Sequence, residues 1–378
     1  MRILLVGEYS NVHWTLAEGL RALGHEVTVV SDGDHWKGYR RDIDLRRRSL
    51  GKWDTLRYVL QAKCLWPRLK GYDVVQLINP VFLDLRAERI LPYYKRLRKQ
   101  NGRLFLGSFG IDKPWVEEGL KPDTFRYSDF YLFGQRRDNV DTRQMEADWL
   151  LGPKGVLFDY VANDCDGIIA SLYENYRCCQ PRYQGKLHFI PFPINRNSQD
   201  DPNNQGYQKK ISPYERESER VLHFFIGLQR TRSAYKGTDI MLRALERLKE
   251  KYPDRMEIVI AENVPFEQYC EMMNHSDVLL DQLYSYTPAM NALQAMSQGL
   301  VVVSGGEPEH YALLGETELH PIINVQPTYK SVYHELEQFI LHPERIPVLR
   351  EQSIAYIRRH HDHIKVARAY ESIYKSLF

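Results

Sequence analysis

The sequence lacks the features that mark several specialised classes of protein. No apolar run approaches the roughly 18 residues that cross a bilayer, so we expect no transmembrane helix. The five cysteines include no C-x-x-C pair, which argues against a zinc site or a disulfide framework and favours reduced thiols. We find no short internal repeat, no low-complexity tract and no cluster of carboxylates and histidines typical of a metal site. The net charge is only +2, and we expect no nucleic-acid partner.

What is present is the composition of an ordinary globular protein. The chain has 378 residues, of which 43% are apolar and 26% are charged. A chain of this length can bury cores in two domains. Near the N-terminus, Glu8 follows the first apolar run too early for the core of a signal peptide. We therefore expect a cytoplasmic protein, either free or peripheral at the inner face of the membrane.

The charge is unevenly distributed along the chain. Residues 1–120 carry 21 Lys and Arg against 14 Asp and Glu, and much of this excess lies in 37–70, close to Trp36, Trp53 and Trp66. A basic segment with exposed tryptophans would suit an anionic lipid surface or a phosphate. The alternative is a solvated charged face, which is the commoner meaning of such a segment. Both interpretations stay open, with weak contact to an anionic membrane through 37–70 as the functional one.

Short apolar runs alternate with helical patterns, which predicts an α/β fold with parallel sheets. In residues 1–193 we expect one doubly wound domain. Its predicted strands are Arg2–Gly7, His25–Ser31, Tyr72–Ile78, Arg103–Ser108, Gly167–Ser171 and Leu187–Pro191. Its predicted helices are Val12–Leu23, 86–100, 154–164 and 173–180. Gly24 directly follows the first helix as a C-terminal stop.

Residues 194–219 are polar and have the composition of a linker. The alternation then restarts, which predicts a second domain of the same kind over 220–355. Its predicted strands are Val221–Gly227, Glu257–Ala261, Val278–Leu283 and Leu300–Ser304. Its predicted helices are Thr238–Lys251, Phe266–Asn274 and Met290–Gln298, followed by helical patterns at 330–341 and 345–377.

Residues 109–152 interrupt the first domain without a clear period and are rich in aromatic residues. A long irregular stretch in a compact domain is usually functional or disordered, and the aromatic content argues against disorder. A packed cap over the sheet and a lid that contacts a substrate remain equally good interpretations.

Ligands of such domains bind outside the carboxyl ends of the parallel strands, so the residues after each strand are the candidates. After the first strand, the loop that carries Tyr9, Ser10 and His13 has backbone amides that suit an anion or sugar hydroxyls, although His13 alone is more often structural. It has no G-x-G-x-x-G motif, so a dinucleotide cofactor is not supported. Asp112, after Arg103–Ser108, is either a hydroxyl acceptor or weak base, or the cap of a following helix.

The second domain offers a more specific motif. Its first strand ends at Gly227, and Arg232 and Lys236 follow before the next helix begins. Two cations in this position would neutralise a diphosphate without a metal ion. Further on, Tyr286, Pro288 and Asn291 lie on a loop at a helix start whose amides suit phosphate, with Gln294 one turn later. A solvated basic loop is the alternative for the first of these motifs.

These stretches together resemble a glycosyltransferase of the GT-B fold, closest to family 4. The resemblance rests on residues 2–31, 187–195 (LHFIPFPIN), the Arg232/Lys236 pair, and 278–309, which ends Gly305-Gly306-Glu307-Pro308-Glu309. It implies two Rossmann-like domains that face each other across a cleft. It also implies that 356–378 forms a helix returning to the first domain, because Tyr356–Leu377 resembles the family's crossing helix.

The sequence departs from the family pattern in the opening loop, where Glu8, Tyr9 and Ser10 replace a Gly-rich stretch, in the Arg–Lys spacing, which is one shorter than the commonest form, and at two donor-site positions. The family commonly has two glutamates eight positions apart, one for the donor sugar and one for the ribose, where this chain has Tyr286 and Gln294. Glutamine can still bind a ribose hydroxyl, whereas tyrosine cannot replace a carboxylate at the sugar. These replacements motivate an alternative function, a non-catalytic protein that binds a nucleotide sugar or a partner transferase.

The resemblance implies transfer of a sugar from a nucleotide diphosphate sugar to a glycan or lipid-linked acceptor, with retention and without a metal or other cofactor. Arg232 and Lys236 would stabilise the leaving diphosphate and Gln294 would hold the ribose. The remaining implied donor contacts are Gly227, Tyr286, Pro288, Asn291 and Glu309. On the acceptor side the implied residues are Tyr9, Ser10, His13 and the catalytic candidate Asp112.

Overall fold

The computed structural model describes residues 1–196 and 221–377. The chain forms two compact units, each built from more than one stretch of sequence. The first unit comprises Met1–Lys121, Arg143–Pro193 and His363–Phe378. The second comprises Pro122–Thr142 and Ile194–Asp362. These boundaries differ from the predicted ones, because part of the aromatic-rich stretch belongs to the second unit. Most of the predicted linker lies outside the described residues.

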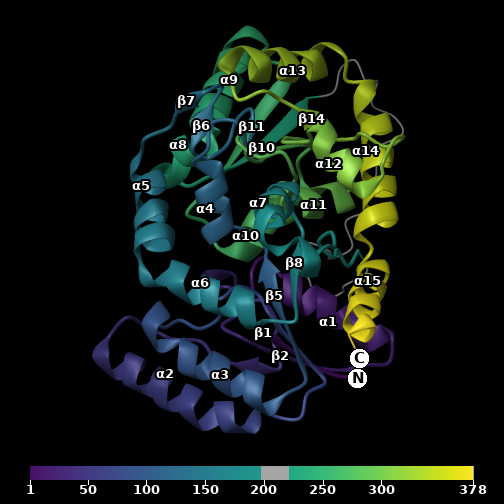
Figure 1. Cartoon of the computed structure of the whole chain (residues 1–378). Helices are drawn as coiled ribbons and strands as arrows, with labels where there is room; N and C mark the ends of the chain where they lie inside the picture. The colour runs from purple at the N-terminus through teal and green to yellow at the C-terminus, as the bar shows by residue number, and fades with distance from the viewer. Residues whose placement is uncertain (197–220, 378) are drawn as a thin grey trace. The chain divides into compact units, whose positions relative to one another are not determined.

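The first unit is built on a seven-stranded parallel sheet in the order β3-β2-β1-β4-β5-β8-β9 (Figure 1). Its strands are β1 Arg2–Val6, β2 Glu26–Ser31, β3 Ile43–Asp44, β4 Val74–Leu77, β5 Arg103–Ser108, β8 Gly167–Ala170 and β9 Leu187–Phe189. The central strands are buried and mostly apolar because parallel strands are covered on both faces, and Gln76 of β4 is a buried polar exception. This order is that of a doubly wound sheet, as the sequence predicts.

The helices that cover this sheet include two that the sequence analysis did not predict. They are α1 Val12–Ala22, α2 Lys52–Leu65, α3 Leu91–Gln100, α4 Lys113–Gly119, α6 Pro153–Asp164, α7 Tyr173–Tyr183 and α15 His363–Ser376. One missed helix is α2, which lies in the basic segment, where exposed apolar residues obscure the usual amphipathic pattern. The other is α4, which has only seven residues and lies in the aromatic-rich stretch 109–152. Helix α1 ends as predicted, with Gly24 at a positive φ of 86°.

The end of the chain returns to the first unit, where α15 packs on α1. A Cβ atom on Gly19 of α1 would lie 2.4 Å from the carbonyl oxygen of His363, so only glycine permits this approach. The helical pattern at 345–377 is divided in the structure, and the crossing helix does not begin at Tyr356 as the resemblance implies. Helix α14, Arg345–Tyr356, continues into a π-helical turn, Ile357–His361, and α15 begins only after Asp362.

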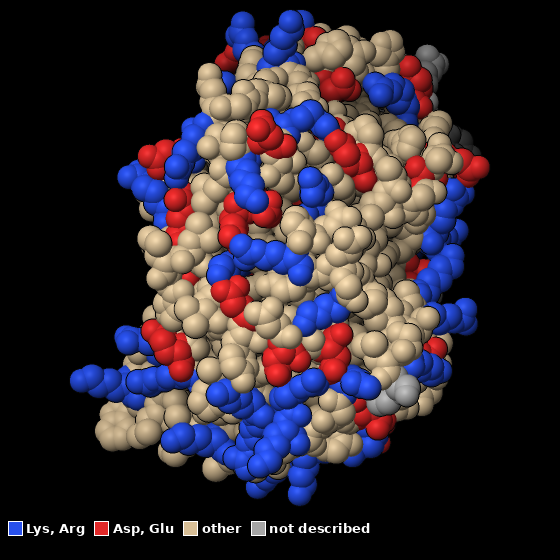
Figure 2. Space-filling view, in the orientation of Figure 1, with Lys and Arg blue, Asp and Glu red and all other residues tan. Residues whose placement is uncertain are grey.

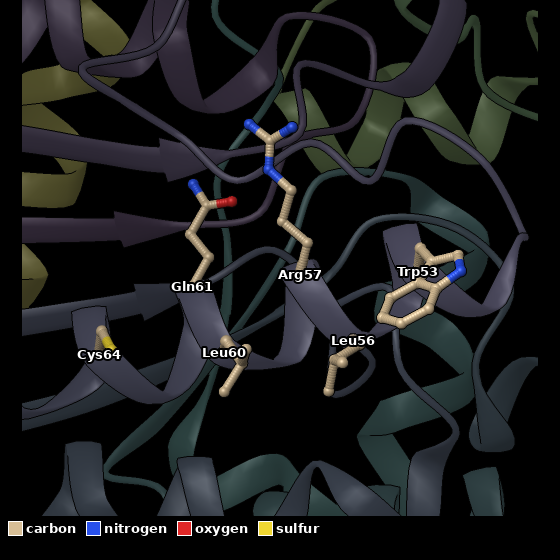
Figure 3. A pocket seen from close by; sticks show the side chains of 6 residues that line it. All are labelled: Trp53, Leu56, Arg57, Leu60, Gln61 and Cys64. Atoms are coloured by element: carbon tan, nitrogen blue, oxygen red, sulfur yellow. The ribbon is translucent and has the colours of Figure 1, made fainter.

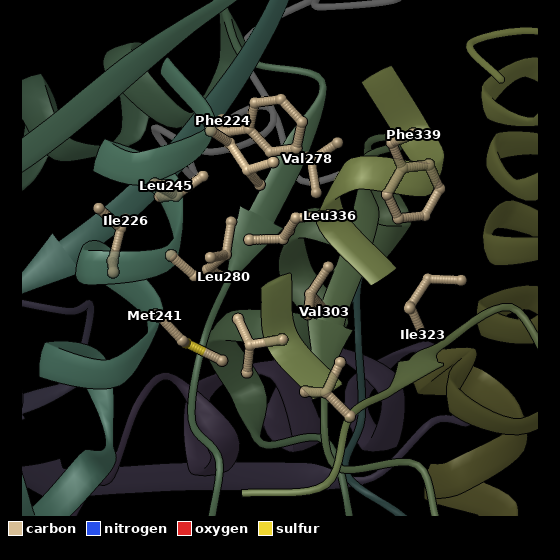
Figure 4. Close-up of a cluster of buried hydrophobic side chains, with 14 of the residues drawn as sticks. Phe224, Ile226, Met241, Leu245, Val278, Leu280, Val303, Ile323, Leu336 and Phe339 are labelled. Atoms are coloured by element: carbon tan, nitrogen blue, oxygen red, sulfur yellow. The ribbon is translucent and has the colours of Figure 1, made fainter. Parts of the chain in front are cut away.

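The second unit contains a five-stranded parallel sheet in the order β11-β10-β12-β13-β14. Its strands are β10 Leu222–Leu228, β11 Met256–Glu262, β12 Val278–Leu280, β13 Val301–Ser304 and β14 Ile323–Asn324. Its helices are α8 Ser233–Lys236, α9 Thr238–Lys251, α10 Phe266–Asn274, α11 Met290–Ser297, α12 Pro308–Leu314, α13 Tyr329–Leu341 and α14. Figure 4 shows its core, in which Phe224 and Leu280 from the sheet lie with Leu245, Leu336 and Phe339 from the helices.

Residues 122–142, which we call the 122–142 segment, belong to this second unit. The segment contains a hairpin of β6, Tyr131–Leu132, and β7, Gln135–Arg136. Phe133 and Gly134 form its turn, both with positive φ, as a two-residue hairpin of type I′ requires. Helix α5, Val140–Glu146, and a π-helical turn, Ala147–Leu151, lead back into the first unit.

We searched the described residues for a helix that could cross a membrane. None has the length and the apolar content that this requires.

Candidate functional site

Polar side chains gather at the carboxyl ends of β10 and β12 in the second unit. Gly227, near the end of β10, lies close to the ring of Tyr269 from α10. A Cβ atom at this glycine would be 3.0 Å from the ring. The Tyr269 hydroxyl donates a hydrogen bond to Asn291 Oδ1 over 3.1 Å. Asn291 Nδ2 in turn donates to Asp281 Oδ1 over 3.3 Å. The predicted residues Gly227 and Asn291 are therefore brought together through Tyr269.

Asp281 is a site residue that the sequence analysis missed. Burial raises the pKa of its carboxyl group, while the nearby Lys236 charge and the Asn291 hydrogen bond partly oppose this. Its second oxygen, Oδ2, is buried and has no hydrogen-bond partner in the part of the chain that the structure describes. Asp281 is the first polar residue after the buried strand Val278–Leu280, and that position at a carboxyl end was the signal that could have identified it.

Lys236 and Arg232 lie at the two ends of one short helix. Lys236 is the last residue of α8, and its carbonyl oxygen accepts a hydrogen bond of 3.0 Å from the Leu283 amide in the loop after β12. Arg232 precedes α8, and its guanidinium lies 4.8 Å from the centre of the Tyr235 ring. Both cations are partly exposed. The loop after β10 thus holds two cations, of which Lys236 lies near the Asp281 carboxyl group. Two cations at a strand end suit an anionic ligand.

The 122–142 segment contacts this loop through hydrogen bonds. Tyr235 of α8 donates a hydrogen bond to Asp129 over 3.1 Å. Arg137 donates to the carbonyl oxygen of Ala234 over 2.8 Å, and its guanidinium stacks 3.4 Å from the centre of the Tyr284 ring. These contacts fix the helix that carries Lys236, so the segment is packed structure of the second unit. The cap and lid interpretations both placed it in the first domain.

Tyr286 is buried, and the same segment surrounds it. Its hydroxyl oxygen accepts a hydrogen bond of 2.7 Å from the Arg126 amide, and the Arg126 guanidinium lies 4.9 Å from the ring centre. The rings of Phe125 and Tyr127 lie 5.4 Å and 5.0 Å from it. Burial raises the pKa of Tyr286 to about 12, so the phenol is neutral near pH 7. Its hydroxyl oxygen is thus hydrogen-bonded within the protein.

Arg126 joins the two glutamates that follow β13. Its guanidinium lies 2.6 Å from Glu307 and forms an ion pair with Glu309 as well. Glu307, which the sequence analysis did not single out, also accepts hydrogen bonds from Tyr127 and from Gln326. The hydrogen bond from Arg126 lowers the pKa of Glu309. Tyr286 and Glu309 are therefore both held by Arg126, which lies 160 positions before Tyr286 and 183 before Glu309 in the chain.

Two other predicted donor residues are buried at the start of α11 and within it. Pro288 lies in the loop before the helix and Gln294 lies inside it. The Gln294 carbonyl oxygen accepts a hydrogen bond of 2.7 Å from Ser297 Oγ. Gly299 follows α11 at a φ of 82°, the left-handed conformation that commonly ends a helix.

In the first unit, backbone amides that follow β1 bind a side chain of the protein, whereas the sequence analysis predicted that amides of this loop bind an anion or sugar hydroxyls. Both carboxylate oxygens of Glu8 accept hydrogen bonds from the first turn of α1, from the His13 amide at 3.1 Å and from the Trp14 amide at 2.9 Å. These two amides are the donors that an anionic ligand would need, and the protein's own carboxylate occupies them. Burial raises the pKa of Glu8 to about 8, against the effect of both hydrogen bonds. The sequence pattern could not reveal this internal cap.

The side chains predicted for this loop have local structural partners. His13 is fully buried, and Nδ1 lies 2.8 Å from the Gly7 carbonyl oxygen. Burial lowers the pKa of His13 to about 3, so the ring is neutral and Nδ1–H is the donor. Ser10 Oγ accepts from Lys37 Nζ over 3.1 Å, and Tyr9 next to it is exposed. His13 thus has the structural role that was the alternative to a ligand contact.

Asp112 caps α4, which was the alternative interpretation of this residue. Its Oδ1 accepts a hydrogen bond of 2.9 Å from the Trp115 amide. Oδ2 accepts hydrogen bonds from Ser108 and from Asn175. Burial raises the pKa of Asp112 to about 6, although all three hydrogen bonds oppose this. Both oxygens therefore have partners within the first unit, which leaves the carboxyl group poorly placed to accept a substrate proton.

A metal-binding cluster would need several ligating side chains close together. Within residues 1–196 and 221–377, no group of three or more His, Cys, Asp and Glu side chains is arranged to hold a metal ion.

Comparison with known proteins identifies the fold. No protein-family model matches the chain, and no curated protein sequence matches it. Sucrose-phosphate synthase from Thermosynechococcus elongatus has a TM-score of 0.59 and 14% identity, over 100% of this chain and 99% of that one. Anabaena HepE in complex with UDP and glucose has a TM-score of 0.58 and 11% identity, over 100% of both chains. UDP-GlcNAc 2-epimerase from Neisseria meningitidis has a TM-score of 0.53 and 11% identity, over 98% and 99%.

These similarities show the fold of the chain. Two parallel-sheet α/β units with a C-terminal helix that packs on the first helix make the fold GT-B-like, as the sequence predicts. Transferases and epimerases share this fold, so the function has to be argued from the residues at the strand ends.

Proposed function

We propose that the protein is a glycosyltransferase that moves a sugar from a nucleotide diphosphate sugar to a glycan or lipid-linked acceptor. The observation that carries the proposal is the pair of cations, Arg232 and Lys236, fixed at the carboxyl end of β10 on a GT-B-like fold. The solved structures of similar fold include HepE with UDP-glucose and a starch synthase from Arabidopsis thaliana with ADP and acarbose. A nucleoside diphosphate is the ligand class that these cations would suit.

The proposed role of the cations is to stabilise the leaving group. As the bond between the sugar and the diphosphate breaks, negative charge grows on the departing phosphate. Lys236 and Arg232 would meet that charge from positions fixed before the reaction. A guanidinium offers a bidentate fork to phosphate oxygens and an ammonium offers a point charge, so the two are complementary. This chemistry needs no divalent metal ion, and we propose retention of configuration.

The remaining donor contacts are proposed from position. Asn291 and the amides near the start of α11 would hold phosphate, and Gln294 would hold the ribose. At the sugar, the family's glutamate is replaced by Tyr286, whose hydroxyl oxygen is engaged by Arg126. Glu309 is the more exposed of the two carboxylates in the same cluster, both of which are joined to Arg126. We propose that this cluster contacts the sugar in place of the missing glutamate.

We expect the reaction to take place in the cytoplasm. A panel of UDP-, ADP- and GDP-sugars would test the proposal by thermal shift. A ligand at 100 times its Kd should stabilise the protein by about 2.7 kcal/mol. The protein is then incubated with the best ligand in the presence of EDTA, and release of the nucleoside diphosphate is measured with and without glycan acceptors.

Three outcomes separate the functions that this fold can support. Release of diphosphate in EDTA that is lost in Lys236→Ala supports the transferase. Interconversion of the sugar without an added acceptor would indicate an epimerase and contradict the proposal. Binding without any turnover, under all acceptor conditions, would favour the non-catalytic alternative that the Tyr286 and Gln294 replacements motivate.

A further inference from the structure

Helix α2 of the first unit presents an apolar stripe to solvent instead of to the core. Trp53, Leu56 and Leu60 are exposed and lie on one face of the helix, with Cys64 one turn further on. Trp53 is 84% exposed, which is unusual for the largest side chain. The opposite face carries Tyr58 and Ala62, which are buried. Figure 3 shows Leu56 and Leu60 pointing the same way from the helix, with Arg57 and Gln61 pointing elsewhere.

Cations flank this stripe. Residues 45–70 contain eight Lys and Arg against one acidic residue, Asp54. Arg57 and Lys63 lie on the two sides of the stripe, and both are exposed. Among the residues that the structure describes, neither lies within ion-pair distance of a carboxylate. Figure 2 shows Lys and Arg side chains gathered over α2 and α3, at the lower end of the view.

A pocket between α2 and α3 extends the basic surface. Its floor contains Trp66, which stacks on Phe82 and meets the Tyr93 ring edge-on. Its rim carries three cations, Lys63, Arg89 and Arg96, and one carboxylate, Glu88. The pocket volume of about 740 Å³ is within the range of small-molecule sites. A cationic rim over an aromatic floor suits an anionic head group with an attached apolar chain.

We infer that α2, with the adjoining α2–α3 pocket, docks on an anionic lipid bilayer. A straight apolar stripe along one convex helix, with cations on both flanks, fits a flat surface that is apolar below and anionic above. A protein partner would more naturally fill a concave apolar groove. Trp53 is the residue type that favours the membrane–water interface. The inference is independent of the proposed transferase activity.

Cys64 makes the inference directly measurable. The other four cysteines are buried, so a maleimide fluorophore would label Cys64 selectively in the unmodified full-length chain. The labelled protein is mixed with vesicles of phosphatidylcholine alone, or with 30% phosphatidylglycerol, at two salt concentrations. We expect a blue shift of the probe and flotation with the anionic vesicles only, both weakened by salt. Brominated lipids should quench the bound probe.

Variants with matched charge changes identify the surface. Arg57→Gln with Lys63→Gln removes two cations of the stripe and should lower partitioning into anionic vesicles about thirtyfold. The control, Lys330→Gln with Arg368→Gln, removes two exposed cations from other helices and should leave partitioning nearly unchanged. Trp53→Ser with Leu60→Ser should abolish the blue shift. All substituted side chains are exposed, so melting temperatures should match that of the parent protein.

Several results would overturn the inference. Equal binding to neutral and anionic vesicles would contradict the role of the cations in binding. Equal losses of partitioning in the two cation variants would contradict the placement of the binding surface on α2. A probe shift that grows with protein concentration without vesicles would identify a second copy as the occupant. A shift produced by inorganic phosphate alone, with no vesicle flotation, would identify a free anion as the ligand.

Discussion

Arg126 lies with its guanidinium 2.6 Å from the buried carboxylate of Glu307, although 180 residues separate the two in the chain. The side chain of Glu307 is 4% exposed and that of Glu309, the second partner of Arg126, is 33% exposed. Arg126 therefore forms ion pairs with one buried carboxylate and one partly exposed carboxylate. The difference in burial determines how strongly each pair should affect stability.

We predict that Arg126 couples more strongly to Glu307 than to Glu309. Hydrogen bonds to charged groups contribute about 1.5–3 kcal/mol when buried, whereas exposed ion pairs contribute about 0.2–1 kcal/mol. Arg126→Met, Glu307→Gln, Glu309→Gln and the two double variants form two double-mutant cycles in urea unfolding. Coupling energies of equal size in the two cycles would contradict the burial argument.

We predict that Lys236→Ala lowers kcat far more than Gln294→Ala does. In the proposed reaction Lys236 meets charge that grows in the transition state, so its loss should appear in kcat. Gln294 would contact a ribose that does not change during the reaction, so its loss should mainly raise KM. Gln294→Glu restores the commoner family residue and should bind donor at least as well. Equal losses of kcat in both Ala variants would show that one of the two is misplaced.

We predict that Asp281→Asn tightens the binding of a nucleoside diphosphate. The Asp281 carboxylate lies near Lys236 and would repel an anionic ligand. Because burial raises the pKa of Asp281, wild-type affinity should rise as the pH falls below neutral and the carboxyl group takes up a proton. Asn keeps the hydrogen bond with Asn291 and cannot titrate, so this part of the pH dependence should disappear. Calorimetric titration with UDP at several pH values measures both effects, and weaker binding to the variant would contradict the prediction.

We predict that His13 contributes to acid unfolding of the first unit. The pKa of His13 is lowered to about 3 in the folded protein, while that of an unfolded histidine is near 6.5. Below pH 6.5 the unfolded chain therefore binds a proton that the folded one excludes, and stability falls by up to about 1.4 kcal/mol per pH unit. In His13→Asn the amide can still donate to the Gly7 carbonyl but cannot titrate. Its urea unfolding should show a slope against pH between 6 and 4 that is shallower by about one proton, and an unchanged slope would contradict the prediction.

The predictable part of the fold was the part encoded by local pattern. The predicted strands Val278–Leu283 and Leu300–Ser304 contain the buried parallel strands β12 and β13, and Gly24 ends the first helix at positive φ as expected. The missed helix α2 shows the limit of periodicity, because its apolar stripe faces solvent and weakens the amphipathic signal. The shortest elements were missed as well, because a strand or helix of two to seven residues has no recognisable period; they include β3, β14, α4, α8 and α12.

The candidate site was only partly predictable, because its contacts join distant residues. Arg232 and Lys236 stand in one short motif, and their position after β10 is confirmed. Their neighbour Asp281 and the cluster around Arg126 depend on chain segments that no local pattern connects. In the first unit, Glu8 accepts hydrogen bonds from two amides in the first turn of α1, and the sequence of the loop does not indicate this contact. The roles proposed for the donor residues stay predictions.

The division of each unit into separate stretches has a consequence for synthesis on the ribosome. Residues 122–142 emerge long before Glu307 and Glu309, the partners that Arg126 will bind. The first sheet emerges early as well, yet α1 can bind α15 only after residues 363–376 have been made. The first unit therefore needs residues from both sides of the second, and exposed surfaces persist on both units while the intervening residues are made. Such long-range closure slows folding and leaves nascent chains dependent on protection from aggregation.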